Sequence, residues 1–222
     1  MSIPHSLQQA AANAAEATAF LQDPAALRAH GKPQLRRFEV ACLLPDGGIA
    51  ETRHIAPALP LFEEAFAAFS RGSQVETTEG PIAVEDLLPG DHLLTRDGEP
   101  QTLLWIGHTN LLPGRPGSKG RSHPLTSFMA DSMGLQKPSS SLVVGPAARL
   151  LRSTSGGSPL LTPATELCDG MTIFETAPPT PVDMYHLCLR RHAVITVGGL
   201  EFETYHPGTE ALKLASHPIK TL

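Results

Sequence analysis

From residue 73 to residue 204 the chain is divided by turn residues into short segments. Pairs such as Asp97-Gly98 and Gly198-Gly199 supply the small and polar residues that tolerate positive φ in tight turns. The segments between the turns alternate apolar and polar residues, or are short apolar runs, which is the pattern of β-strands. Segments this short do not favour long helices, so the sequence predicts a mainly β fold.

Ten segments carry the strand pattern. The expected strands cover residues 73–77, 81–84, 92–95, 101–108, 142–144, 149–152, 171–174, 183–189, 193–197 and 200–204. The composition agrees with this prediction, since 19 Gly and 21 Pro favour many turns. Clusters of Pro, Gly, Ser and Lys in residues 113–141 predict a long loop or insertion, with a turn of helix at 125–133.

The first 60 residues have a different character. Ser6 and Gln9 form a possible capping box before the Ala-rich stretch 7–22, which predicts a helical segment. Residues 35–57 then alternate on both sides of a turn at Pro45-Asp46-Gly47-Gly48, which predicts a β-hairpin. This hairpin could extend the sheet that follows or present an edge strand to a partner.

Three phenylalanines lie just after this extension. Phe62, Phe66 and Phe69 are spaced by four and three residues and follow Pro60, which is typical of one helical face. We expect these rings to anchor the core of the protein.

Charge and cysteine content exclude several classes of function. The net charge is −5 and no run of Lys or Arg is long enough to suggest a phosphate-binding face, so we do not expect nucleic-acid binding. No apolar segment is long enough for a membrane helix, and the N-terminus does not resemble a signal peptide. Three widely spaced cysteines, Cys42, Cys168 and Cys188, do not form a disulfide framework and indicate reduced thiols. We therefore expect a cytoplasmic protein without a cofactor or metal, although export without an N-terminal signal remains open.

Several motifs together carry a resemblance to a known family. They are FSRGSQVET at 69–77, GPIAVEDLLPGD at 80–91, TRDG at 95–98 and WIG at 105–107. In this order they resemble the opening of bacterial Hint (Hedgehog/intein) domains, and residues 185–208 resemble the end of the same domain. The resemblance implies a Hint-type all-β domain over residues 61–208, preceded by the extension 1–60 and followed by a tail at 209–222.

The resemblance also implies where self-cleavage chemistry would be located. In working members a Cys or Ser at the first position attacks the preceding carbonyl, and a Thr-x-x-His stretch polarises that amide and protonates the leaving amine. By the resemblance, the nucleophile falls at Ala68, and the Thr and His fall at Gly145 and Ala148. None of these three side chains can perform the chemistry, so all three catalytic positions are vacated.

Other family positions are retained or substituted. Ser73 stands in place of the family's Thr, His186 replaces an Asp that follows a Tyr, and His192 keeps the expected type. We therefore predict a catalytically inactive Hint-like domain that acts as a binding or structural module for a protein partner, which the sequence does not identify. The partner surface would be the hairpin or the vacated cleft around Ala68, Ala148 and His192.

Two alternatives remain open from the residues alone. The first is an autoprocessing domain that uses Ser70 or Ser73 as its nucleophile. The second is a hydrolase or metal-binding protein that uses His186, Cys188 and His192, because a Cys near a His can act as a nucleophile or metal ligand. Against the second alternative, free cysteines are usually buried, so we expect a buried structural Cys188 with one solvent-facing histidine.

Overall fold

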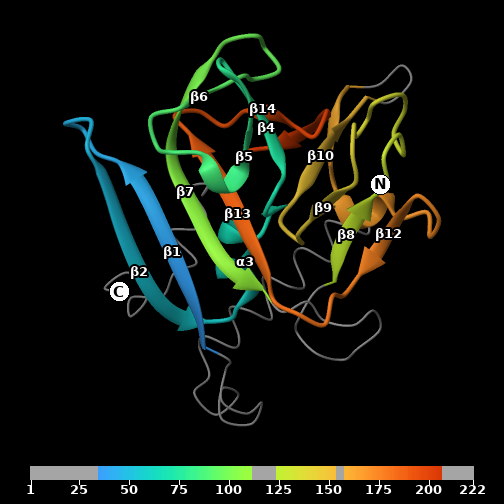
Figure 1. The fold of residues 1–222 in the computed structure, drawn as a ribbon, viewed down its shortest axis with the longest axis horizontal. Helices are drawn as coiled ribbons and strands as arrows, with labels where there is room; N and C mark the ends of the chain where they lie inside the picture. The colour runs from blue at the N-terminus through green and yellow to red at the C-terminus, as the bar shows by residue number, and fades with distance from the viewer. Residues whose placement is uncertain (1–34, 112–123, 154–157, 207–222) are drawn as a thin grey trace, which may run out of the picture.

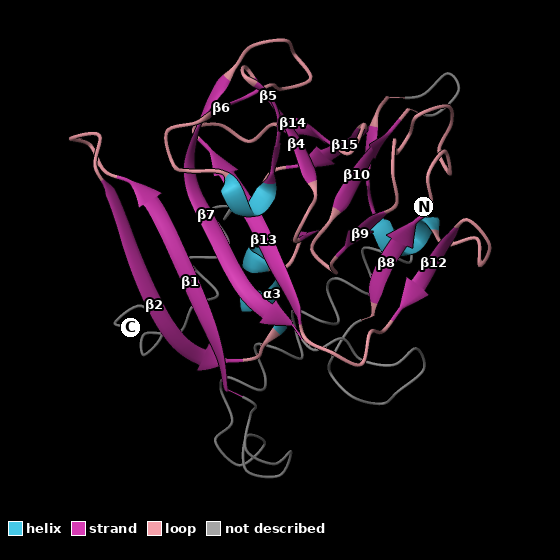
Figure 2. Cartoon of the chain, viewed as in Figure 1, coloured by secondary structure: helices cyan, strands magenta, loops and turns pink. Residues whose placement is uncertain are grey.

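The computed structural model describes residues 35–111, 124–153 and 158–206 (Figure 1). The predicted helix at 7–22 and the predicted tail at 209–222 lie outside these ranges. Within them the protein is mainly β, as the sequence predicts, and Figure 2 shows strands with only short helices between them. None of the helices in the described ranges is long and apolar enough to cross a membrane.

The strands form one continuous, largely antiparallel arrangement. Its main path runs β11-β10-β15-β14-β4-β6-β7-β13-β3-β9-β8-β12. The strands are β1 (Leu35–Leu43), β2 (Ile49–Pro57), β3 (Phe69–Ser70), β4 (Gln74–Thr77), β5 (Gly80–Ala83), β6 (His92–Leu93), β7 (Gln101–Leu111), β8 (Leu125–Phe128), β9 (Leu142–Val144), β10 (Arg149–Arg152), β11 (Leu160–Pro163), β12 (Ile173–Thr176), β13 (Val182–Leu189), β14 (Val194–Val197) and β15 (Leu200–Glu203). The helices are α3 (Pro60–Phe66) and the short 3₁₀ turns η1 (Val84–Asp86) and η2 (Ala164–Leu167).

The long strand β7 is the centre of this arrangement. It pairs with β13 from Leu111↔Val182 to Trp105↔Cys188, with β1 through residues 105–109 of the same stretch, and with β6 at residues 101 and 102. Its Leu103 and Ile106 side chains join the main core, which also contains Phe69 and Phe202. These two rings make an edge-to-face contact with centroids 5.5 Å apart, a favoured aromatic geometry.

The predicted hairpin is confirmed, and it extends the sheet. Strand β1 pairs with β2 through nine residues and with β7 through Phe38↔Thr109 to Cys42↔Trp105. The turn uses Asp46 and Gly47 as expected: Gly47 has a φ of 85°, and the Asp46 carboxylate accepts the N–H of Gly48. Figure 1 shows the hairpin in blue and teal, beside β7 at one side of the molecule.

Helix α3 is shorter than the spacing of its aromatic residues predicts. It ends at Phe66, and Phe62 and Phe66 pack on Phe38 of β1 with ring centroids 5.9 and 4.8 Å apart. The prediction is wrong for Phe69, which lies in β3 and is fully buried in the main core. Strand pairing with Tyr185 and Val144 determines the backbone here and overrides the helical spacing.

Besides β3, two further strands differ from the prediction. The expected turn of helix at 125–133 is wrong, because residues 125–128 form β8 between β9 and β12. Its Leu125 and Phe128 side chains are fully buried. Strand β11 pairs with β10 and was also missed.

A buried ion pair joins the hairpin to α3. Arg36 Nη1 lies 2.7 Å from Glu63 Oε1, with side chains only 10 % and 6 % exposed. Replacing Arg36 by Met removes this guanidinium from a carboxylate in a buried position. We expect Arg36→Met to lower the free energy of unfolding by about 3 kcal/mol, measured by urea denaturation.

The matched control for this prediction is Arg71→Met. Arg71 pairs with Glu85 at 3.4 Å, but its side chain is 67 % exposed. Its loss should cost less than about 1 kcal/mol, because exposed ion pairs are screened by water. Equal effects of the two substitutions would show that Arg36 contributes nothing beyond a surface contact.

Candidate functional site

The position assigned to the nucleophile lies in a buried junction between α3 and β3. Ala67 and Ala68 are both fully buried. The N–H of Ala67 donates to the carbonyl of Glu63 (2.8 Å), which ends the helix, and the N–H of Ala68 donates to Tyr185 of β13 (3.1 Å). The backbone is therefore held on both sides of the peptide bond that a working domain would cleave.

The loop 145–148, which follows β9, binds this junction through its backbone. The N–H of Gly145 donates to the carbonyl of Ala68 at 2.8 Å. The N–H of Ala147 donates to the carbonyl of Ala67 at 3.1 Å. The structure thus brings positions 68 and 145 into direct contact, and the contacts are made by peptide groups.

Gly145 allows this close approach. A Cβ atom added there would lie 2.2 Å from the Ala67 carbonyl oxygen and 2.6 Å from Cε of Met184. Its φ is not positive, so the glycine is required by space and not by backbone conformation. Ala148 is 2 % exposed and belongs to the main core. Because Ala68 and Ala148 are buried, neither contributes to an open cleft.

The two serines proposed as substitute nucleophiles are also buried, with exposed fractions of 9 % for Ser70 and 3 % for Ser73. The Ser73 hydroxyl donates to the carbonyl of Ser70 at 2.7 Å. This bond closes the turn between β3 and β4, which is a structural use of the hydroxyl.

His186 is buried in the interior of the protein, on β13. Its Nδ1 donates to the carbonyl of Glu64 at 2.9 Å. Burial lowers the pKa of His186 from 6.5 to about 4, partly opposed by hydrogen bonds to the backbone of Glu64 and Glu203. The ring is therefore neutral at neutral pH, and it joins α3 to β13.

Cys188 and His192 have separate surroundings. Cys188 is half-buried, its thiol contacts the carbonyl of Leu189, and burial raises the pKa of that thiol. The His192 side chain is 42 % exposed, and its Nε2 lies 2.6 Å from Glu203 Oε1. His192 thus fits the expected solvent-facing histidine. Within the described ranges no three His, Cys, Asp or Glu side chains are grouped to hold a metal ion.

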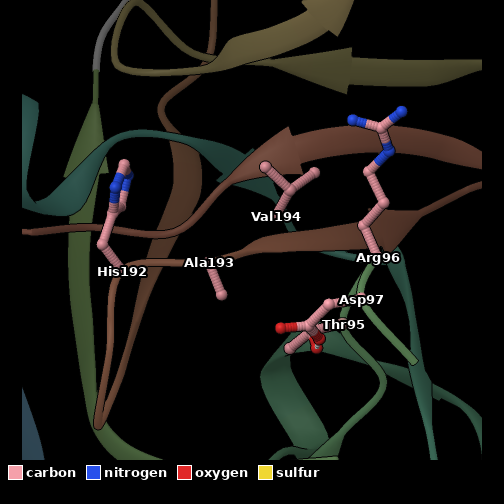
Figure 3. Close-up of a pocket in the computed structure, with 6 residues that line it drawn as sticks. All are labelled: Thr95, Arg96, Asp97, His192, Ala193 and Val194. Carbon is pink, nitrogen blue, oxygen red and sulfur yellow. Dashed lines mark hydrogen bonds between the residues drawn. The ribbon is translucent and has the colours of Figure 1, made fainter. Parts of the chain in front are cut away.

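An open depression lies beside His192 (Figure 3). It is lined by Thr95, Arg96, Asp97, His192, Ala193 and Val194. Hydrogen bonds from the Thr95 hydroxyl and the Glu99 N–H lower the pKa of Asp97. The TRDG motif at 95–98 therefore forms a turn that satisfies its own polar groups, as expected for turn chemistry.

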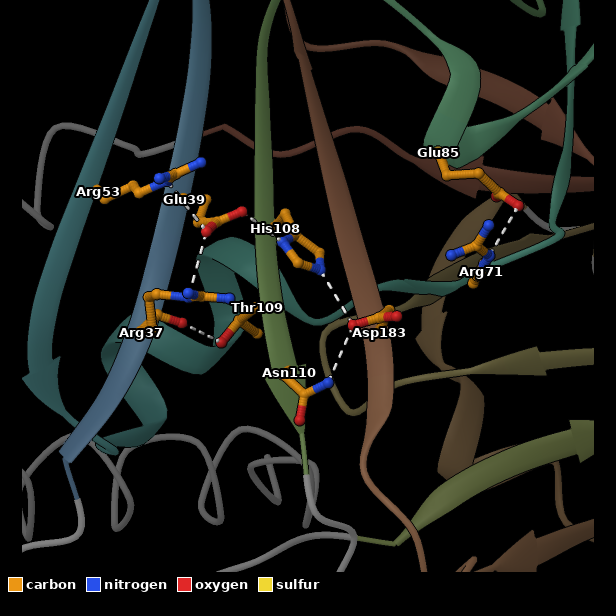
Figure 4. A network of polar contacts seen from close by, with 9 residues as sticks. All are labelled: Arg37, Glu39, Arg53, Arg71, Glu85, His108, Thr109, Asn110 and Asp183. Carbon is orange, nitrogen blue, oxygen red and sulfur yellow. Dashed lines mark hydrogen bonds and ion pairs between the residues drawn. The ribbon is translucent and has the colours of Figure 1, made fainter.

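A second polar cluster was missed by the sequence reasoning. His108 bridges Glu39 of β1 and Asp183 of β13, with each N–O distance 3.2 Å (Figure 4). Hydrogen bonds from Asn110 and His108 lower the pKa of Asp183. The three strands contribute one partner each from distant parts of the sequence, so only the strand register could have revealed the cluster.

A family model described as the Hint domain matches residues 67–209. Among solved structures, the MchDnaB-1 intein is 18 % identical, with 62 % of this chain and 100 % of that chain covered and a TM-score of 0.39. A bacterial intein-like domain from Clostridium thermocellum is 14 % identical, with 63 % and 99 % covered and a TM-score of 0.41. No curated protein matches the chain.

The close contact between Gly145 and the Ala67 carbonyl leaves no room for a side chain. We expect Gly145→Ala to lower the free energy of unfolding by about 3 kcal/mol, because the new methyl group overlaps a buried carbonyl. The control is Gly98→Ala, where φ is +82° but the space is open. It should cost only about 1–2 kcal/mol, the penalty of a left-handed conformation. Equal losses in urea denaturation would contradict a steric role for Gly145.

The buried His186 should make the free energy of unfolding depend on pH. Its folded pKa (about 4) lies below its unfolded value (6.5), so protons bind the unfolded chain more readily. The titration of this histidine therefore leaves the free energy of unfolding unchanged above pH 6.5, and that free energy declines as the pH is lowered from 6.5 to 4. The decline amounts to about 3 kcal/mol.

The test is urea denaturation between pH 7 and pH 4.5 with His186→Asn. An Asn amide can still donate to Glu64 but does not titrate, so this variant should lose much less stability over that range than the natural chain. His92→Asn, at an exposed position, should keep the acid sensitivity of the natural chain. If the natural chain and His186→Asn have parallel pH profiles, another group is responsible.

Proposed function

The chain belongs to the family of Hint domains, and we propose that it is a member that does not cleave its own backbone and acts as a binding or structural module. One observation carries this proposal. The position that the resemblance gives to the nucleophile is Ala68, whose methyl group is fully buried against the core. Covalent catalysis at this position requires a side chain with a lone pair, and alanine has none.

The second requirement of the chemistry is a group that protonates the leaving amine. The corresponding positions are Gly145 and Ala148, which carry no titratable group. The N–H of Ala147 does point at the Ala67 carbonyl oxygen (3.1 Å), as a donor that stabilises an oxyanion would. With neither a nucleophile nor an acid, that donor can only order the backbone.

The proposed module offers two surfaces. One is the depression at His192, where Arg96, Asp97 and Glu203 supply charges of both signs. The other is the hairpin. We propose a protein as the partner and not a nucleic acid, since the net charge is −5. A reducing compartment such as the cytoplasm is supported by three free cysteines at positions 42, 168 and 188.

The test is the intact mass of the purified full chain during several days at neutral pH, with and without a thiol such as dithiothreitol. We expect one full-length mass in both samples, because no ester or thioester forms for the thiol to cleave. Hydroxylamine, which cleaves esters and thioesters, should also leave the chain intact.

Fragments that end between residues 67 and 72 would overturn the proposal. In that case Ser70→Ala and Ser73→Ala would identify the nucleophile, since only one of them should abolish the cut. If no cleavage occurs, both variants should give one full-length mass, as the natural chain does. They therefore serve as controls for the absence of cleavage.

A further inference from the structure

Strand β2 lies at an edge of the sheet that the described residues form. Within the described part of the chain β1 is its only strand partner, and the nine-residue pairing from Leu35↔Pro57 to Leu43↔Ile49 contains no bulge. Natural edge strands are usually protected by Lys, Pro, bulges or short length. Strand β2 is long and regular, and its only proline, Pro57, is its last residue.

The hairpin turn determines which backbone groups point to this edge. The N–H of Leu44 donates to the carbonyl of Gly48 (2.7 Å), so these two residues form a hydrogen-bonded pair. Hydrogen-bonded and non-hydrogen-bonded pairs alternate along an antiparallel ladder. The even-numbered residues of β2 therefore bond to β1. The N–H and C=O groups of Ile49, Glu51, Arg53 and Ile55 point away from it.

We propose that β2 pairs antiparallel with β2 of a second copy of this chain, around a two-fold axis at Thr52. In this register Glu51 lies opposite Arg53 of the other copy, and Ile49 lies opposite Ile55. All four outward-facing residues then exchange backbone hydrogen bonds with outward-facing residues. The inference concerns a surface outside the cleavage position, so it holds whether or not the chain cleaves itself.

Charge selects this register among those that symmetry allows. An axis at Glu51 would place two carboxylates opposite each other, and an axis at Arg53 would oppose two guanidinium groups. Like charges directly opposite each other destabilise a sheet, whereas opposite charges stabilise it. An axis between residues would oppose outward-facing and inward-facing backbone groups. Among axes at or between residues 51 and 53, only the axis at Thr52 avoids both like-charge pairs and mismatched backbone groups.

The side chains at this edge fit the same partner. Ile49 and Ile55 are 44 % and 74 % exposed, and the proposed pairing covers each with the other. Glu51 has no ion pair within the described residues. Arg53 is held 3.3 Å from Glu39 (Figure 4), which orients its guanidinium on one face of the sheet. A guanidinium has five N–H donors, so it can bind the carboxylate of a second Glu51 as well.

The size of the edge determines how strong the association is. A single strand pair buries less than the ~1,000 Å² typical of stable specific interfaces. The dimer should therefore be in equilibrium with the monomer over an accessible concentration range. Residues 1–34 or 207–222 of the same chain are the competing occupants of the edge, and they would keep the protein monomeric.

The test is sedimentation equilibrium of the full chain over a range of concentrations. The natural chain should dimerise, and Glu51→Arg should raise the dimer Kd at least about tenfold, since two attractive pairs become repulsive. Arg53→Glu should do the same. An equimolar mixture of the two variants should form a heterodimer, because every charged pair is then complementary. Glu79→Arg makes the same charge change at an exposed turn and should leave the Kd unchanged.

The register is tested by cysteine cross-linking. Thr52→Cys places two thiols on the axis, within the Cα separation that a disulfide spans, and should give a covalent dimer on oxidation. His54→Cys keeps its thiols about four residues apart along the two strands, or roughly 13 Å, and should not exceed the background of the natural chain.

Circular dichroism confirms that each variant remains folded. A natural chain that stays monomeric at all concentrations would overturn the proposal, as would a Glu51→Arg variant with an unchanged Kd. A mixture of the two charge variants that does not associate would overturn the Glu51–Arg53 pairing. Equal cross-linking at positions 52 and 54 would overturn the register.

Discussion

The pairing of β7 with β13 is the constraint on which the rest of the structure depends. These strands are about 70 residues apart in sequence, yet they are in register from Leu111↔Val182 to Trp105↔Cys188. The pairing positions Tyr185, whose carbonyl holds Ala68, and His186, which binds the end of α3. The polar bridge through His108 depends on it as well. Without this ladder, neither the buried junction nor the hairpin would have a surface to pack on.

At the junction, packing accounts for the residues at the positions to which the resemblance assigns the self-cleavage chemistry. A self-cleaving site requires side chains with lone pairs and room for them to move. Here the loop 145–148 lies so close that a single Cβ at Gly145 would collide with the Ala67 carbonyl. Hydrogen bonds from Gly145 and Ala147 satisfy the two buried carbonyls, as buried backbone groups require. The same atoms therefore stabilise the fold.

The sequence predicts local features of this protein better than its long-range contacts. Asp46-Gly47 and Gly198-Gly199 specify tight turns through positive φ, and both turns occur where expected. The spacing of Phe69 predicts a helix, but pairing with β13 and β9 places it in a strand. Strand β8 was missed because the turn-rich residues beside it hide a short buried run. No local pattern could show that His108 meets Glu39 and Asp183, or that Glu203 meets His192.

The way in which β1 lies along β7 has a consequence for any attempt to shorten the protein. Strand β1 covers the backbone of β7 from Trp105 to Thr109, and Phe38 covers Phe66. A truncated chain that starts after the hairpin would expose unpaired peptide groups beside a patch of aromatic rings. Such a surface invites aggregation during expression and refolding. The hairpin therefore covers the β7 backbone and the aromatic rings, so a fragment that starts after the hairpin is a poor substitute for the chain that contains it.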